Sequence, residues 1–158
     1  MLDFGSGTGE LAEHVAPGNY TGYDTDLEGI AAARRRYPHH VFSAELPPSD
    51  ESFDTIVLLA VIEHIQDPHA VLRDLKNRLA TGGRIVLTTM SPGFQRFHEA
   101  GARIRVFSRE AAHEHSTLFD QQALRQAAEN LGLSLALYKV FLLGGNQLAV
   151  VTLPKEGL

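Results

Sequence analysis

The stretch Met1-Leu2-Asp3-Phe4-Gly5-Ser6-Gly7-Thr8-Gly9-Glu10 decides the fold of this chain. Apolar and acidic residues run into three glycines at alternate positions, and a helix-like run opens at Glu10. Glycine permits positive φ and lets a ligand approach the backbone, and a helix N-terminus presents free N–H groups. The stretch therefore predicts a short strand, a tight turn and a helix start, the corner at which open α/β sheets hold nucleotides.

The composition limits the possible functions. The chain has 158 residues, and we expect residues 1–158 to form a single domain. A net charge of −5 argues against nucleic-acid binding, because such modules carry a basic face. The absence of cysteine excludes disulfides and thiolate metal sites. With no membrane-length apolar run and no signal peptide, we expect a cytoplasmic protein without a membrane partner.

The first 90 residues alternate strand-like and helix-like patterns. Strands are predicted at residues 1–4, 20–23, 41–44, 53–60 and 84–90. Helices are predicted at residues 10–16 and 27–37, and from Pro68 to a stop at Thr81-Gly82-Gly83, with Asp26 and Asp67 as caps. This order predicts a parallel sheet with helices on both faces, in which the apolar run 53–60 is buried on both sides.

The second half of the chain has a different pattern. Asp120 is expected to cap a further helix, and two apolar strands, 133–143 and 147–153, flank a Gly144-Gly145-Asn146 hairpin turn. The last strand should therefore run antiparallel to its neighbour. The segment 91–118 lacks periodicity and is rich in Arg, His and Phe. Long irregular inserts are typically functional or mobile, and we expect a substrate-side insert, with an ordinary surface loop as the alternative.

Several motifs together resemble class I S-adenosylmethionine-dependent methyltransferases, in particular the small-molecule enzymes of types 11 and 12. The resemblance is carried, in chain order, by Asp3-x-Gly5-x-Gly7-x-Gly9, Tyr23-Asp24, Phe53-Asp54, Val61-Ile62-Glu63-His64, Asp67-Pro68, and Leu79 through Gly82-Gly83 into Ile85-Val86-Leu87. It implies a three-layer αβα sandwich around a Rossmann-like, mostly parallel seven-stranded sheet with an antiparallel last strand. It also implies an S-adenosylmethionine-dependent methyltransferase that acts on a small molecule.

The same resemblance implies which residues bind the cofactor, S-adenosyl-L-methionine. The ribose and adenine side would be formed by Asp24, Thr25, Ala44 and Glu45. The methionine side would be formed by Asp3 and by the turn residues Gly5, Ser6, Gly7 and Gly9. The floor of the pocket would be formed by Leu59, Ala60 and Val61. In this assignment the Asp24 carboxylate accepts hydrogen bonds from the ribose hydroxyls.

Two functions other than methyl transfer also use a glycine turn. Dinucleotide-binding dehydrogenases carry G-x-G-x-x-G, whereas the third glycine here comes one position earlier, at Gly9, and is followed by Glu10. An acid at that position suits a pyrophosphate poorly, so an NAD-dependent oxidoreductase is disfavoured. A non-catalytic module that binds S-adenosylmethionine or S-adenosylhomocysteine is the other alternative.

His64 is the candidate catalytic residue. Methyl transfer from a sulfonium is an in-line displacement that mainly requires alignment and exclusion of water, and a base is needed only when the acceptor must lose a proton. His64 follows the buried strand and could be that base or could only orient its loop. We expect no metal site, because related metal-binding enzymes carry Glu-x-x-Glu-His and Ala60 replaces the first Glu here. The residues that could complete such a site are His98, His113 and His115.

The glycine turn lies very close to Met1. Its strand has at most four residues, and the helices that precede the turn in family members are absent. We therefore expect an N-terminally truncated chain, whose lid would come from a dimer mate, a partner chain or the missing residues. The sequence leaves open the identity of the acceptor and whether oxygen, nitrogen or carbon is methylated.

Overall fold

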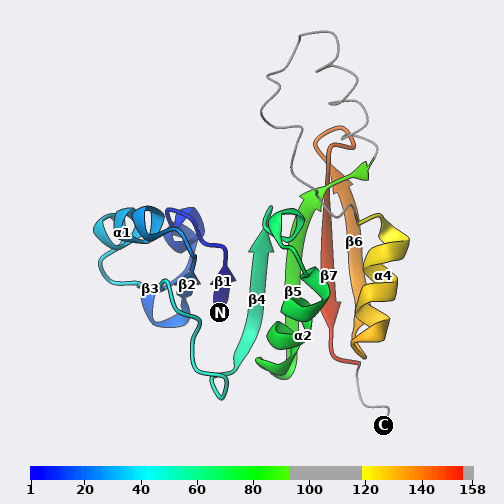
Figure 1. Ribbon diagram of the computed structural model, residues 1–158, viewed down its shortest axis with the longest axis horizontal. Helices are drawn as coiled ribbons and strands as arrows, with labels where there is room; N and C mark the ends of the chain where they lie inside the picture. Colours follow the sequence, from blue (N-terminus) through cyan, green and yellow to red (C-terminus); the bar gives the residue numbers. More distant parts are fainter. Residues whose placement is uncertain (93–118, 155–158) are drawn as a thin grey trace, which may run out of the picture.

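Seven strands form one mixed sheet in the computed structural model, which describes residues 1–92 and 119–154 (Figure 1). The order across the sheet is β3-β2-β1-β4-β5-β7-β6. β7 runs antiparallel to both β5 and β6, whereas the pairs from β3 to β5 are parallel. This arrangement confirms the predicted Rossmann-like sheet with a reversed last strand. Of the predicted insert 91–118, residues 93–118 lie outside the described part of the chain.

Most elements lie where the sequence predicted them. The strands are β1 (Leu2–Phe4), β2 (Thr21–Tyr23), β3 (Val41–Ser43), β4 (Phe53–Leu59), β5 (Leu79–Met90), β6 (Ser134–Phe141) and β7 (Asn146–Thr152). The α-helices are α1 (Leu27–Arg36), α2 (Pro68–Asn77) and α4 (Gln121–Asn130), and the 3-10 segments are η1 (Glu10–His14), η2 (Pro17–Asn19) and η3 (Ile62–His64). The three predicted caps are confirmed: the side chains of Asp26, Asp67 and Asp120 each accept a backbone N–H of the first helical turn.

Two predicted boundaries were wrong. The helix expected at 10–16 is only the 3-10 segment η1, because Val15 is already extended. The helix expected to reach residue 81 ends at Asn77, and β5 begins at Leu79 rather than at Arg84. Leu79 pairs with Phe53, and the register then shifts before the next pair. The two glycines suggested as a helix stop therefore lie in an irregular part of β5.

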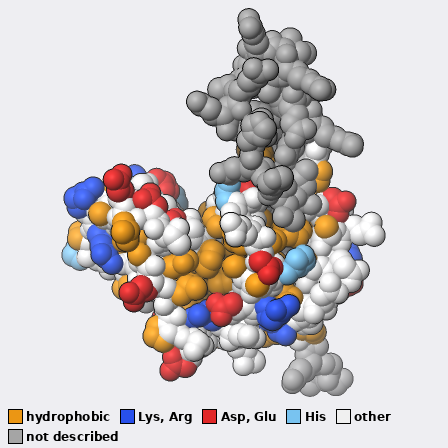
Figure 2. Space-filling model, in the orientation of Figure 1, with side chains coloured by type: hydrophobic (Ala, Val, Ile, Leu, Met, Phe, Trp, Pro, Cys, Tyr) orange, Lys and Arg blue, Asp and Glu red, His pale blue; other side chains and the backbone are white. Residues whose placement is uncertain are grey.

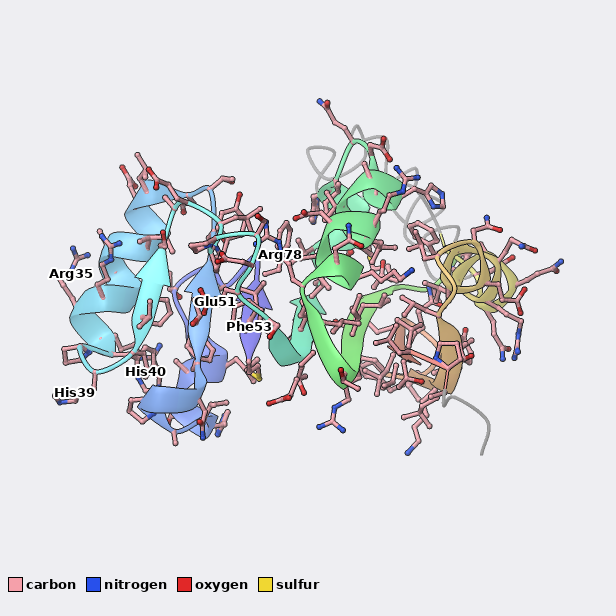
Figure 3. The ribbon with its side chains drawn as sticks, turned by 90° about the horizontal axis from the view of Figure 1, so that it is seen from below. Arg35, His39, His40, Glu51, Phe53 and Arg78 are labelled. Carbon is pink, nitrogen blue, oxygen red and sulfur yellow. The ribbon has the colours of Figure 1, made fainter. Side chains whose placement is uncertain are left out.

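Side chains alternate across the strands and build two cores on opposite faces of the sheet. The larger core joins the sheet to α2 and α4, and its most buried members are Leu2, Ile56, Leu58, Leu75, Ile85 and Ala149. The smaller core joins the sheet to η1 and α1 and consists of Ala12, Tyr20, Ile30, Ala33 and Phe42. These two cores make the predicted three layers, with α2 and α4 on the same side of the sheet (Figure 3). None of the helices in residues 1–92 and 119–154 is long and apolar enough to span a membrane.

Arg78 fixes the loop that joins β3 to β4. Its side chain is buried, and Nη1 donates to the carbonyl oxygens of Pro47 at 2.6 Å and Pro48 at 3.0 Å. Nε donates to Asp74 of α2 at 3.0 Å, and the Arg78 carbonyl accepts the N–H of Phe53 at 2.8 Å (Figure 3). The side chain of Arg78 thus ties α2 to the loop, and its backbone carbonyl adds the start of β4.

Replacing Arg78 tests this anchor. Arg78→Met should lower the free energy of unfolding by about 2 kcal/mol, because buried carbonyl oxygens lose a charged donor. Arg73→Met removes an exposed arginine from the same helix and should change stability by no more than about 0.5 kcal/mol. Urea unfolding measures both variants, and equal midpoints for the two would contradict the anchoring role.

Candidate functional site

The glycine turn is bound to the end of β2. The N–H groups of Gly5 and Ser6 both donate to the carbonyl oxygen of Tyr23, at 2.7 and 2.9 Å. The next N–H, that of Gly7, donates to the Asp24 carboxylate at 2.8 Å. Three consecutive amides of the turn are therefore taken up by two consecutive residues of the neighbouring strand end. These bonds hold the turn in place although β1 has only three residues.

Asp24 stands where three strand ends meet. Its Oδ2 accepts from Gly7, its Oδ1 accepts from the N–H of Asp26 at 2.9 Å, and its own N–H donates to the Ser43 carbonyl at 3.2 Å. The side chain is half-buried. Because each carboxylate oxygen accepts more than one hydrogen bond, the fixed carboxylate keeps capacity for hydroxyl donors of a ligand.

The three glycines of the turn have different structural roles, although each has a positive φ. A Cβ on Gly5 would lie 2.4 Å from Val61 Cγ2, and one on Gly9 would lie 2.7 Å from Phe42 Cζ. A Cβ on Gly7 would meet nothing within 4 Å. The outer glycines therefore permit close packing, and the middle glycine borders open space that a ligand can approach.

The end of β4 closes the site from the other side. Ala60 has a φ of 55°, which is unusual for a residue with a side chain. Its N–H donates to the carbonyl and hydroxyl oxygens of Thr88 on β5, at 3.0 and 3.1 Å. This bend directs the chain toward the glycine turn, where Val61 packs against Gly5.

A cavity of about 470 Å³ opens between these strand ends, within the usual size range of small-molecule sites. It is lined by Phe4, Gly5, Tyr23, Asp24, Thr25, Leu59, Ala60, Val61, His64, Ile65 and Val71. Most of these side chains are apolar, and hydrophobic side chains gather over β1 and β4 beside α2 in Figure 2. The structure thus brings together seven predicted site residues, namely Gly5, Asp24, Thr25, Leu59, Ala60, Val61 and His64.

The other predicted cofactor residues do not line this cavity. Asp3 belongs to β1, Ser6, Gly7 and Gly9 belong to the turn that follows β1, and Ala44 and Glu45 follow β3. The Glu45 side chain is exposed, and its N–H donates to Ser43 Oγ at 2.9 Å. Ser6 is 6% exposed, and its Oγ has no hydrogen-bond partner among the described residues. The cofactor roles of these residues stay predictions.

Four lining residues were missed by sequence reasoning, namely Phe4, Tyr23, Ile65 and Val71. Phe4 and Tyr23 pack against each other with ring centroids 5.0 Å apart. Each directly precedes a predicted ligand residue, Gly5 or Asp24, so position at a strand end was the available signal. Ile65 and Val71 come from the η3–α2 region, and only the tertiary fold brings them to the cavity.

Glu63 and His64 are adjacent but differently placed. His64 is exposed and lines the cavity, and its backbone N–H donates to the Val61 carbonyl at 3.0 Å. Glu63 is 5% exposed, and its Oε2 lacks a partner among the described residues. Within residues 1–92 and 119–154, no group of three His, Asp or Glu side chains could hold a metal ion. The three histidines considered for such a site, His98, His113 and His115, lie outside the described residues.

Asp3 is buried beneath the turn and accepts a hydrogen bond from the Tyr20 hydroxyl at 2.7 Å. Burial raises the pKa of the Asp3 carboxyl above its usual range, and the negative charges of Asp24 and Glu10 add to the rise. The Tyr20 hydrogen bond opposes this rise, because it stabilises the ionised carboxylate. Burial and the Asp3 carboxylate in turn raise the pKa of Tyr20, so the phenol stays a donor.

The sheet order, the reversed β7 and the glycine turn beside Asp24 define a Rossmann-like ligand-binding domain. Comparison with known families identifies the family to which the chain belongs within this class. The family described as "Methyltransferase domain" matches residues 1–137, and the chain belongs to this family.

Known relatives and structures agree with this family. A ubiquinone biosynthesis O-methyltransferase of Hydrogenovibrio crunogenus is 24% identical over 149 residues, 85% of this chain and 62% of the relative. A demethylmenaquinone methyltransferase of Chlorobaculum parvum is 33% identical over 90 residues, 52% of this chain and 37% of the relative. The chain therefore spans less than two thirds of the length of either relative.

Solved structures share the fold. A putative methyltransferase in complex with the Trm112 methyltransferase activator of Haloferax volcanii superposes with a TM-score of 0.77 at 18% identity, covering 99% of this chain and 82% of that one. Magnesium protoporphyrin IX methyltransferase from Synechocystis PCC 6803, solved with bound SAH, superposes with a TM-score of 0.72 at 17% identity. The superposition covers 97% of this chain and 73% of that one.

Alanine substitutions separate the tasks of the glycines. Gly5→Ala should lower the free energy of unfolding by about 3 kcal/mol, because an unfavourable φ is combined with a clash against Val61. Gly7→Ala should cost only about 1 kcal/mol, because its φ is positive but the space beside it is open. Urea unfolding of the two variants provides the comparison. Equal losses of stability would show that Val61 does not constrain the turn.

Proposed function

We propose that the protein of which this chain is part transfers a methyl group from S-adenosyl-L-methionine to a small-molecule acceptor. The observation that carries the proposal is the hydrogen bonding of the glycine turn, in which the N–H groups of Gly5, Ser6 and Gly7 all donate to the end of β2. Such a turn has fewer free amides to offer a pyrophosphate, because those of Gly5, Ser6 and Gly7 are already used. A ligand with an adenosine group but no phosphate suits the site better than NAD.

The residues present fit this cofactor. Asp24 is fixed by two backbone donors and can accept hydrogen bonds from the ribose hydroxyls. Gly7 borders open space, and the apolar Val61 and Ile65 line the cavity beside Asp24, as a flat adenine ring requires. We retain Thr25, Ala44 and Glu45 as proposed adenine contacts, and Leu59 and Ala60 as the proposed floor. Asp3, Ser6 and Gly9 support the turn on the proposed methionine side.

Methyl transfer requires little from the protein beyond positioning of the cofactor and the acceptor. When bound, S-adenosylmethionine supplies a methyl group on a sulfonium, which is already activated for displacement. The chain must hold the cofactor, align the acceptor and exclude water, and the apolar side chains Phe4, Tyr23 and Val71 suit the last task. His64 lines the same cavity, and we assign it as the base for an acceptor that must lose a proton.

The relatives guide the proposal of the acceptor and the partner. Two of them are named for ubiquinone biosynthesis and for demethylmenaquinone, and these names support a small-molecule acceptor. One structural neighbour was solved in complex with an activator protein, which supports a second chain as the source of a lid. We propose a dimer mate or a partner chain in that role.

Ligand titration tests the proposed function. S-adenosylhomocysteine should bind with measurable heat and raise the melting temperature, whereas NAD should do neither. Asp24→Ala should weaken S-adenosylhomocysteine at least about 30-fold, because two hydroxyl hydrogen bonds to a charged acceptor and the Gly7 anchor are lost together.

A matched acid provides the control for this titration. Asp26→Ala removes the α1 cap, whose carboxylate accepts from the Glu28 N–H at 3.0 Å, and should change the affinity no more than about threefold. Tighter binding of NAD than of S-adenosylhomocysteine would overturn the proposal. Equal effects of the two aspartate variants would remove Asp24 from the ribose site.

A further inference from the structure

A buried carboxylate without a cationic partner lies beneath the glycine turn. Asp3 is 3% exposed, and it forms no ion pair with any described residue. The smaller core around it is apolar apart from Tyr20, which is itself 2% exposed. An isolated buried carboxylate is costly unless it is hydrogen-bonded. In this fold the cost is offset by a single side-chain donor, the Tyr20 hydroxyl.

The base of the turn collects further polar groups. Glu10 in η1 and Asp24 after β2 both act electrostatically on Asp3, so three acids surround the turn. The unpartnered Ser6 Oγ lies in the same layer, because a Cβ on Gly22, the β2 partner of Asp3, would lie 2.9 Å from it. Negative charge and a buried hydroxyl thus gather where the proposed cofactor would place its amino-acid end.

We propose that Tyr20 is a positioning residue for the cofactor: its hydroxyl holds Asp3 ionised, and the charge of Asp3 favours the ammonium group of the bound ligand. This inference rests on the proposed function. Tyr20 is 17 residues from Asp3 in sequence and does not line the cavity, so it acts only through the carboxylate. Coulomb attraction needs no direct contact in a site of low dielectric.

The sign of the expected pH dependence follows from the surroundings of Asp3. Its raised pKa means that the carboxylate takes up a proton at a higher pH than an exposed aspartate would. Attraction for an ammonium group is present above that pKa and is lost as the pH falls through it. Among the described residues, the Tyr20 hydroxyl is the side-chain donor that opposes the rise, so its removal should move the loss of attraction to higher pH.

Few other titratable groups face this pair. Glu10 from η1 and Asp24 after β2 act on Asp3, and Tyr37 at the end of α1 acts on Tyr20. The β4 residue paired with Asp3 is Val57, and α1 contributes Ile30 and Ala33 to the core. Val57, Ile30 and Ala33 carry no titratable group.

Two histidines lie close to Tyr20 or to the cavity. The ring of His40 packs edge-on against Tyr20 with centroids 5.5 Å apart, and its Nε2 lies 2.8 Å from the Val15 carbonyl oxygen. His64 lines the cavity, so the measurements are made in a His64→Gln background.

The test is calorimetric titration of S-adenosylhomocysteine over a pH series that begins above neutral pH and descends to the lowest pH at which the chain stays folded. Tyr20→Phe should bind as the parent does at the upper end and about three- to tenfold more weakly in the range where the parent loses affinity, with the midpoint of the profile shifted upward. Asp3→Asn should bind more weakly than the parent at the upper end of the series, match it at the acidic end, and so lose this pH dependence. Tyr37→Phe is the matched control, because its hydroxyl lies 3.5 Å from the exposed Glu13 and does not contact Asp3.

The outcomes separate the inference from the proposed function. A loss in Tyr20→Phe that is uniform in pH would overturn the positioning role, since a merely structural defect does not move the midpoint. The same profile in Asp3→Asn and in the parent would overturn it as well. Failure of the unsubstituted chain, with His64 in place, to bind S-adenosylhomocysteine at any pH would instead overturn the proposed function. A midpoint shifted upward in Tyr20→Phe, together with an unshifted Tyr37→Phe, would support the inference.

Discussion

The hydrogen bonds between the glycine turn and the end of β2 are the constraint on which the site depends. β1 has three residues and cannot fix its own end, so the turn is held by Tyr23 and Asp24. The same bonds settle what the turn can offer a ligand. The amides of Gly5, Ser6 and Gly7 are already used, and the Asp24 carboxylate beside them is negative. We infer that this glycine-rich corner suits a hydroxylated, cationic ligand better than a phosphate.

The opposite wall of the site depends on strain at a single residue. Ala60 takes a positive φ at the end of β4 and so brings Val61 against Gly5. Left-handed backbone in a residue with a side chain costs about 1 kcal/mol and persists only where the surroundings enforce it. Here the two hydrogen bonds that the Ala60 N–H donates to the Thr88 carbonyl and hydroxyl oxygens enforce it. Gly5 and Ala60 therefore shape one opening from two strands, and neither can be understood alone.

Local signals in the sequence predicted much of this molecule, and non-local contacts account for the rest. Helix caps such as Asp26 and Asp67 act within a few residues, and the hairpin before β7 needs only its turn, so both were predicted correctly. The end of α2 was missed because β5 starts early to pair with Phe53, which is distant in sequence. The hydrogen bond from Tyr20, the residue before β2, to Asp3 of β1 joins residues 17 positions apart and has no sequence signature.

We infer that Asp24 receives the ribose of a phosphate-free cofactor and that its methionine part passes the open side of Gly7. A crystal structure of the chain with S-adenosylhomocysteine tests it most directly. The account predicts density in the cavity between β1, β2 and β4, with both ribose hydroxyls on the Asp24 carboxylate and the ligand passing over Gly7. A ligand bound outside this cavity, or ribose hydroxyls that form no hydrogen bond with Asp24, would contradict this inference.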